Sequence, residues 1–334
     1  MMRKVLLITL LVFLLKDARS QDPHFSQFFA SPLTLNPALT GKFDGTIRVT
    51  GNYRNQWPTI NRAFTTTTAS VDFPILRNSI GSNDTWGLGV MGYSDQSANS
   101  ALKFNYLTVS TAFHKGLDED GYSQFGAGFQ ATYTNMILDV SNLKFEDQLT
   151  PFGFTGTTSE VFNSSTLKNN YFDMNAGLLY SHSTNETNNI YAGVSMYHIL
   201  RPKQSFTGTY FILNPRTTLH AGGFFPLSER NTVHLSALYS MQAKANELVL
   251  GAAIQLPVSE GDKPTSVYAG SWMRLNDAII PYVGLEFDNF RFGLTYDINT
   301  SSLKPASQSR GGMEISLIYI ARPPESKGLP CPKF

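Results

Sequence analysis

Long runs of strict alternation between apolar and polar residues recur along most of this chain. In the stretch "FRFGLTYDIN", residues 290–299, aromatic and aliphatic side chains occupy every second position, and polar residues or glycine stand between them. A period of two places successive side chains on opposite faces of an extended strand, so each run predicts a β-strand with one apolar and one polar face. The chain is therefore expected to be all-β.

The length and number of these runs favour a membrane barrel over a soluble β-protein. Most cover about 10 to 14 residues, whereas soluble strands commonly have about 5 to 6 and a tilted membrane strand needs roughly 9 to 11. We predict a transmembrane antiparallel β-barrel of about 14 strands, an even number as in bacterial outer-membrane barrels. The expected strands cover residues 44–54, 62–74, 85–95, 101–115, 122–135, 171–182, 190–200, 216–226, 232–243, 246–256, 266–275, 279–288, 290–299 and 312–321.

The composition agrees with such a barrel and excludes several other classes of protein. Charged residues make up 15% of the chain, against roughly 25% in a typical soluble domain, and aromatic residues make up 13%. A net charge of +1 leaves no basic face for nucleic acid. The single cysteine, Cys331, excludes an intrachain disulfide and a cysteine-rich metal site.

The two ends of the chain are expected to lie outside the barrel wall. Residues 1–20 combine the basic pair Arg3 and Lys4 with an apolar run and a polar end at Ser20, which indicates a secretory signal peptide; a retained signal anchor is the alternative. The barrel is assigned to residues 44–321, and residues 322–334 are expected to form a periplasmic tail. Cys331 in that tail either pairs with the thiol of a partner or is inert.

Residues 21–43 between signal peptide and barrel cannot be a strand. The stretch "QDPHFSQFFASPLTLNPALTG" is aromatic, does not alternate and is interrupted by prolines, so it predicts short helical or irregular pieces. Such an apolar segment would not remain exposed in the periplasm. We predict that it folds into the lumen as a plug, or alternatively packs beneath the periplasmic rim. The candidate plug residues are Phe25, Phe28, Phe29, Leu33, Leu35, Asn36 and Pro37, with the three phenylalanines on one helical face.

Connection lengths predict the orientation of the barrel. If both termini are periplasmic, the external connections include the long segments 136–170, 201–215 and 300–311, while most periplasmic turns are short. This asymmetry is typical of outer-membrane barrels. We therefore expect a location in the cell outer membrane, with both termini in the periplasm and lipid against the outer faces of the strands.

Two external segments carry aromatic side chains suited to binding a protein partner. Trp57 stands beside Pro58 at a strand end, and the long segment 136–170 holds four phenylalanines. A loop of that length needs its own fold, a function or disorder, and tryptophan and arginine are favoured anchors in interfaces. A position in the membrane girdle is the alternative for Trp57. The candidate contact residues are Arg54, Gln56, Trp57, Phe145, Phe152, Phe154 and Phe162.

The polar strand faces carry charges that are expected to line the lumen, among them Arg54, Glu286, Arg291 and Asp297. They form either a charged constriction that contacts a ligand or a salt-bridged interior that keeps the barrel from collapsing. No histidine lies in a close metal-binding spacing such as HExxH, and no GxSxG motif or glycine-rich phosphate loop occurs. We therefore predict no catalytic, cofactor or metal site, and a protein that is not an enzyme.

Motifs at both ends of the chain resemble one family. The stretch "QDPHFSQFFASPLTLNPALTG", then "YRNQWP" at 53–58, "YDINTSSLKPASQSRGGMEISLIYI" at 296–320 and the ending "PCPKF" are similar to the PorP/SprF outer-membrane proteins of Bacteroidota. The resemblance implies a barrel of type IX secretion and gliding motility that binds, exports or anchors a large surface adhesin. It also implies two kinds of partner, the C-terminal domain of the adhesin and other components of the secretion system, periplasmic ones among them.

A second hypothesis is an outer-membrane channel or transporter for a small or apolar solute. A barrel of fourteen strands is wide enough for a lumen. The stretch Asn36–Ala38 is similar to an Asn-Pro-Ala stretch in the hatch of long-chain fatty-acid transporters. An outer-membrane hydrolase is a third possibility, but no Ser/His/Asp cluster supports it.

Overall fold

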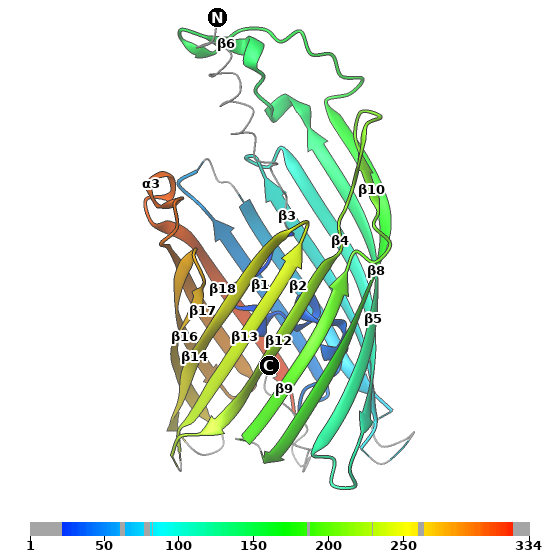
Figure 1. The fold of residues 1–334 in the computed structure, drawn as a ribbon, viewed down its shortest axis with the longest axis vertical. Coiled ribbons are helices and arrows are strands. Elements are labelled where there is room, and N and C mark those ends of the chain that lie inside the picture. Colours follow the sequence, from blue (N-terminus) through cyan, green and yellow to red (C-terminus); the bar gives the residue numbers. More distant parts are fainter. Residues whose placement is uncertain are drawn as a thin grey trace, which may run out of the picture.

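The chain forms a closed antiparallel β-barrel of fourteen strands, as predicted (Figure 1). The computed structural model describes residues 22–60, 64–76, 81, 83–185, 188–228, 230–259 and 264–322. The expected signal peptide, residues 1–20, and Cys331 lie outside the described residues. Successive barrel strands are hydrogen-bonded neighbours, and the ring closes where Ile47 lies opposite Ala321 and Gln56 opposite Gly312.

Each strand expected from the alternation corresponds to one strand of the wall. These are β1 (Ile47–Gln56), β2 (Phe64–Ile75), β3 (Thr85–Ser97), β4 (Leu102–Gly116), β5 (Ser123–Asp139), β8 (Thr166–Asn185), β9 (Asn188–Tyr197), β12 (Arg216–Pro226), β13 (Thr232–Gln242), β14 (Ala245–Ser259), β15 (Thr265–Arg274), β16 (Ala278–Phe287), β17 (Phe290–Asn299) and β18 (Arg310–Ala321).

The two rims of the barrel differ. We call the rim where β1 begins and β18 ends the terminal rim, and the opposite one the loop rim. The long connections lie at the loop rim and contain short elements of their own. These are η3 (Val140–Asn142), η4 (Glu146–Gln148), β6 (Leu149–Thr150), β7 (Gly153–Phe154), β10 (Lys203–Ser205), β11 (Tyr210–Ile212) and α3 (Lys304–Ser307).

Strands β5 and β8 extend further past the loop rim than the sequence predicts. The expected strand 171–182 is part of a strand of 20 residues that begins at Thr166, and Thr166 lies opposite Asp139 of β5. Residues 166–170, "TLKNN", carry almost no apolar side chains, so their strand conformation leaves no alternating signal. Figure 1 shows both strands rising above the ends of the others.

The faces of the wall are reversed relative to a soluble protein. On β17, Phe292 and Leu294 point outward and are 46% and 44% exposed, whereas the inward Thr295 and Asp297 are each 1% exposed. This inversion suits a wall with hydrocarbon outside and polar groups inside. None of the helices in the described part of the chain is long and apolar enough to cross a membrane.

The N-terminal segment lies inside the barrel. It contains η1 (Phe28–Ala30), α2 (Pro32–Leu35) and η2 (Pro37–Leu39), which pack against the inner faces of the wall (Figure 1). Leu33 is 1% exposed, and Asn36 and Leu39 are fully buried. We refer to residues 22–43 as the plug. The three phenylalanines were expected to share one helical face. Residues 25–27 are not helical, however, so the three side chains diverge.

Glycines in the wall make room for the plug. A Cβ atom added to Gly128 of β5 would lie 2.3 Å from the carbonyl carbon of Pro37, and one added to Gly177 of β8 would lie 1.9 Å from the side-chain oxygen of Asn36. Glycine inside a strand commonly marks such a close backbone approach. The lumen is therefore shaped for this segment.

We predict that Gly128→Val destabilises the plugged barrel, because the added side chain overlaps the backbone of η2. Overpacking of this kind typically costs about 1 to 3 kcal/mol of unfolding free energy. Urea unfolding in detergent and protease cleavage of the plug would measure the effect. Gly92→Val is the matched control, since nothing lies within 4 Å of a Cβ added there. Equal stability of the two variants would contradict the close approach.

Candidate functional site in the barrel interior

A buried ion network joins the wall on the loop side of the plug. One amino group of Arg54 lies 2.8 Å from a carboxylate oxygen of Glu314, and the other lies 3.2 Å from Asp297. Arg274 approaches the same oxygen of Asp297 at 3.0 Å. These side chains are 6% exposed or less. These four charged side chains are therefore paired away from bulk water, and Arg274 also pairs with Glu247 at 3.2 Å and with Asp277 at 2.9 Å.

The plug completes this network with its own polar groups. The backbone N–H groups of Ser26 and Gln27 donate to the two carboxylate oxygens of Glu314 at 2.6 and 2.8 Å. The hydroxyl of Ser26 donates to Asp297 at 2.8 Å. Hydrogen bonds to a charged group are stronger than those between neutral groups. The network is therefore the anchor of the first part of the plug.

Two predicted site residues meet in this network. Asp297 was expected to line the lumen, and the structure places it there. Arg54 was expected both among the lumen charges and at an external contact surface, and the second expectation is wrong: Arg54 is 1% exposed and points inward, whereas its neighbour Tyr53 is 38% exposed on the outer face. The reason is the strand period itself, which puts adjacent residues of β1 on opposite faces.

A second buried pair holds the end of the plug. Arg48 of β1 donates to both carboxylate oxygens of Asp72 of β2, at 2.9 and 2.7 Å. The guanidinium also donates to the carbonyl of Leu39, and Asp72 accepts the N–H of Gly41 at 2.7 Å. Asp72 was not among the residues expected to line the lumen. The register of β1 and β2, in which Asp72 lies opposite Arg48, is the feature that identifies it.

Asn36 ties the middle of the plug to the opposite wall. Its amide nitrogen donates to the carbonyl of Leu178 at 3.0 Å and lies 2.9 Å from the Nε2 atom of His220. Its side-chain oxygen accepts the N–H of Ala38 at 2.8 Å and so caps η2, which begins at Pro37. In this structure the Asn-Pro-Ala stretch is buried, and its asparagine links the plug to the wall by hydrogen bonds.

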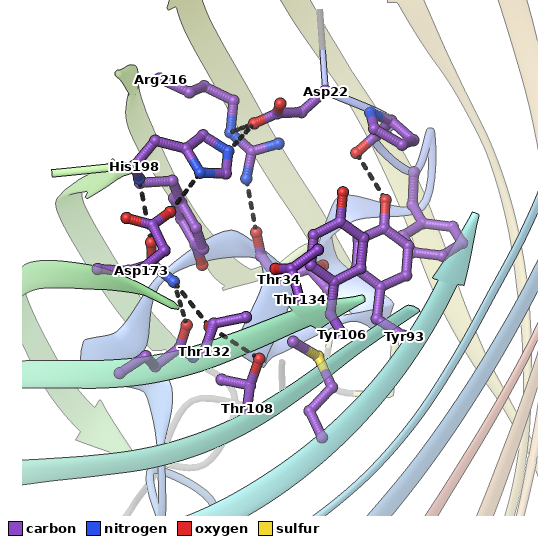
Figure 2. A pocket seen from close by; sticks show the side chains of 16 residues that line it. Asp22, Thr34, Tyr93, Tyr106, Thr108, Thr132, Thr134, Asp173, His198 and Arg216 are labelled. Carbon is purple, nitrogen blue, oxygen red and sulfur yellow. Dashed lines mark hydrogen bonds and ion pairs between the residues drawn. The ribbon is translucent and has the colours of Figure 1, made fainter. Parts of the chain in front are cut away.

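On the loop side of the plug, the lumen holds a cavity of about 50 Å³ with charged residues on one wall (Figure 2). His198, just after β9, lies between two carboxylates: its Nε2 atom is 2.6 Å from Asp22, and its Nδ1 atom bonds Asp173. Arg216 approaches Asp22 at 3.7 Å. The beginning of the plug is therefore clamped to β8, β9 and β12.

Aromatic side chains form the other wall of this cavity. The rings of Tyr93 and Tyr106 stack at 4.8 Å, and the hydroxyl of Tyr93 donates to the carbonyl of Pro23. Phe25 and Met91 complete this apolar part. The cavity can hold a small amphipathic group. Among the described residues, no cluster of three or more His, Cys, Asp or Glu side chains could bind a metal ion.

A separate aromatic cavity lies on the terminal side of the plug. It has a volume of about 40 Å³, and Phe29 reaches it and packs on Trp272 with ring centroids 4.7 Å apart. The predicted lumen charge Arg291 lines this cavity, and its Nη2 atom lies 2.9 Å from the Oε2 atom of Glu286, its direct cross-strand partner. Phe25 and Phe29 thus line cavities on opposite sides of the plug, while Phe28, Leu33 and Leu35 are buried in it.

Some of the candidate contact residues at the loop rim pack against neighbouring side chains, and the others are open to solvent. Trp57 packs on Phe64 at 5.6 Å, with Gln56 half-buried beside it. In the loop 140–165, Phe145 and Phe162 stack on each other at 5.7 Å. The remaining two phenylalanines are open to solvent, Phe152 being 90% exposed and Phe154 47% exposed.

The charge clamp predicts a pH dependence. Burial alone would lower the pKa of His198, but the nearby Asp22 and Asp173 raise it from 6.5 to about 9. Burial alone would raise the pKa of Asp22, but His198 and Arg216 bring it below its ordinary value. The contribution of His198 to stability is therefore full below pH 6.5 and lost as the pH rises through about 9. That of Asp22 is present above about pH 4 and lost in acid.

We expect His198→Asn to lower the unfolding free energy by about 2 to 3 kcal/mol at pH 6, and by much less at pH 10. Asparagine tolerates the positive φ of 60° at this position, so backbone strain does not confuse the result. Urea unfolding of both proteins at pH 6, 8 and 10 would measure the difference. A loss that stays constant across this range would refute the charged clamp.

Replacing Arg54, the cation that contacts both Glu314 and Asp297, should lower the unfolding free energy more than replacing His198. Arg54→Met leaves Glu314 and Asp297 buried with one cation fewer, and breaking a buried pair typically costs about 3 to 5 kcal/mol. Arg310→Met on the exposed end of β18 is the control, with an expected change within about 0.5 kcal/mol. Similar unfolding midpoints for both variants would show that the network does not hold the plug.

Several solved structures have a similar barrel. The toluene transporter TbuX of Ralstonia pickettii is 10% identical, with 86% of this chain and 91% of that chain covered and a TM-score of 0.47. The toluene transporter TodX of Pseudomonas putida is 11% identical, with 90% and 94% covered and a TM-score of 0.47. A Pseudomonas aeruginosa FadL homologue is 11% identical, with 85% and 92% covered and a TM-score of 0.46.

The family of the chain is identified by a match that covers most of its length. A comparison with curated proteins found no match. Residues 18–319 match the family described as type IX secretion system membrane protein PorP/SprF, and this range covers the plug and all but the last two residues of the barrel wall. The chain therefore belongs to the PorP/SprF family of type IX secretion system outer-membrane proteins.

Proposed function

We propose that this barrel works in type IX secretion and gliding motility by binding a secreted surface adhesin through its C-terminal domain, and so helps to export or anchor it. Family membership supplies the secretion system. The observation that carries the proposal is a filled lumen combined with an exposed apolar surface at the loop rim. Such a molecule is suited to holding a partner at its surface.

The filled lumen argues against an open conduit. The plug is bound by the ion network around Arg54, the pair Arg48–Asp72 and the buried amide of Asn36. A chain could pass only after all three attachments break. Each leaves a buried polar or charged group without its partner, which is costly.

The loop 140–165 offers the apolar surface. Phe152 and Val161 are 90% and 89% exposed, and Leu149 is 59% exposed. Exposed apolar side chains gathered in one loop mark a binding surface more often than scattered ones do. We propose that the loop rim faces the cell exterior and that both termini are periplasmic, where other components of the secretion system would be met.

Replacing Phe152 and Val161 by serine should reduce adhesin recovery at least tenfold when the barrel is purified from its own cells, because both side chains lose their apolar contacts. Glu160→Ser, an exposed polar position in the same loop, is the control and should leave recovery unchanged. Undiminished recovery with the double variant would remove this loop from the interface. Absence of any adhesin with the unaltered barrel would remove the proposed function.

The second candidate remains a channel for a small or apolar solute. The observation in its favour is the cavity of about 50 Å³ above the plug, with its stacked tyrosines. Planar-bilayer recording and liposome swelling separate the two functions. We expect no steady conductance and no solute uptake, whereas either would favour the channel.

A further inference from the structure

We propose that the upper part of β8 is a docking edge, to which a partner adds an extended β-strand. The inference rests on the proposed function and identifies the partner segment as an extended stretch of the adhesin. It starts from a gap in the pairing of the wall. Elsewhere each wall strand is paired on both sides along most of its length, but β8 is not.

Half of β8 has a neighbour on one side only. Its pairing with β5 runs from Thr166 opposite Asp139 down to His182 opposite Ser123. Its pairing with β9 begins only at Ala176, opposite Met196. Residues 166–175 therefore form an edge strand that projects above the end of β9, as Figure 1 shows.

One hydrogen bond establishes which backbone groups face the open edge. Ile199, just beyond β9, donates its N–H to the carbonyl of Met174 at 3.1 Å. In an antiparallel ladder the N–H and C=O groups of alternate residues point to the same side. The groups of Phe172, Asn170 and Lys168 therefore point to that edge. Within the described residues, none of these three forms a backbone hydrogen bond there.

This edge is placed in water, where a partner can reach it. Unpaired backbone groups are not tolerated against hydrocarbon. The outward side chains change accordingly along the strand, from the apolar Met174 and Phe172, the latter 70% exposed, to the exposed polar Asn170 and Lys168. From about Phe172 toward Thr166, β8 therefore extends beyond the apolar outer surface of the wall.

The hairpin β10–β11 borders the edge without closing it. It lies next to β8 and contacts it through Gln204, whose amide donates to the hydroxyl of Tyr171 at 3.0 Å. It forms a separate two-stranded sheet and adds no strand to the wall. Tyr210 and Phe211 on this hairpin are 57% and 54% exposed. They provide apolar contacts beside the free hydrogen-bonding groups.

These features specify the chemistry of the occupant. Free N–H and C=O groups repeating at every second residue match only another extended strand, and strand addition to such an edge is a common mode of peptide recognition. Most proteins cover or shorten exposed edges, because they attract other chains. The neighbouring aromatic side chains favour a segment with apolar residues at alternate positions. The segment of the adhesin C-terminal domain that docks here is therefore an extended strand of this kind.

The test removes one backbone donor. Asn170→Pro deletes the N–H that faces the open edge, and a proline at an edge position costs no hydrogen bond within the wall. Asn170→Ala is the matched control, since both variants lose the side-chain bond from Asn135, and only proline loses the backbone donor. We expect at least a tenfold drop in adhesin recovered with the proline variant, and recovery within twofold of the unaltered protein for alanine.

A crosslinking measurement locates the contact independently. A photocrosslinking amino acid at Lys168 should join the barrel to the adhesin, whereas one at Arg310, across the loop rim, should not. Equal recovery with both Asn170 variants, or a crosslink only within the barrel chain, would overturn the docking edge. In that case adhesin recovered with the unaltered barrel would leave the proposed function standing. No adhesin with any form of the protein would overturn both.

Discussion

A backbone N–H or C=O group has no partner in hydrocarbon, and the rest of this structure depends on that constraint. The wall meets it by closing: β1 pairs with β18 along its whole length, so the ring has no edge within the apolar belt. Closure also reverses the usual distribution of side chains. Phe292 and Leu294 face outward, while Thr295 and Asp297 on the same strand face inward.

The reversed wall creates a second requirement inside. Fourteen strands enclose a lumen that wall side chains alone do not fill, and the inward groups include charges that need partners. The plug supplies both volume and hydrogen bonds. Glu314 receives the N–H groups of Ser26 and Gln27, and Arg48 donates to the carbonyl of Leu39. Wall and plug satisfy each other's polar groups, so neither is complete alone.

Beyond the loop rim the chain is in water, so backbone groups without a protein partner are tolerated there. Strand β8 continues without a partner on one side, loops carry exposed phenylalanine and valine, and a hairpin forms a separate two-stranded sheet beside the wall. In water these features cost little, and they expose hydrogen-bonding and apolar groups together. The proposed binding of a partner rests on this part of the structure.

How far the sequence predicts this protein depends on whether a feature is local. Alternation is local, so all fourteen wall strands were predictable, and the aromatic, proline-broken segment 21–43 could be recognised as no strand, with the lumen and the rim as its two predicted places. Strand residues 166–170 were missed because water on both faces leaves no alternation. Arg54 was predicted as a lumen charge from the strand period and as a contact residue from its place near Trp57, and only the first prediction agrees with its burial.

The contacts between charged residues inside the lumen join positions that are far apart in the sequence. Arg48 meets Asp72 through the register of two strands, and His198 meets Asp22 across 176 residues. By itself, the sequence determined a closed barrel with an apolar exterior, because side-chain period and strand length act within each strand. Only the tertiary structure decided which charges neutralise which, where the plug is clamped and which strand edge stays open. Those outcomes depend on the path of the plug and on where neighbouring strands end.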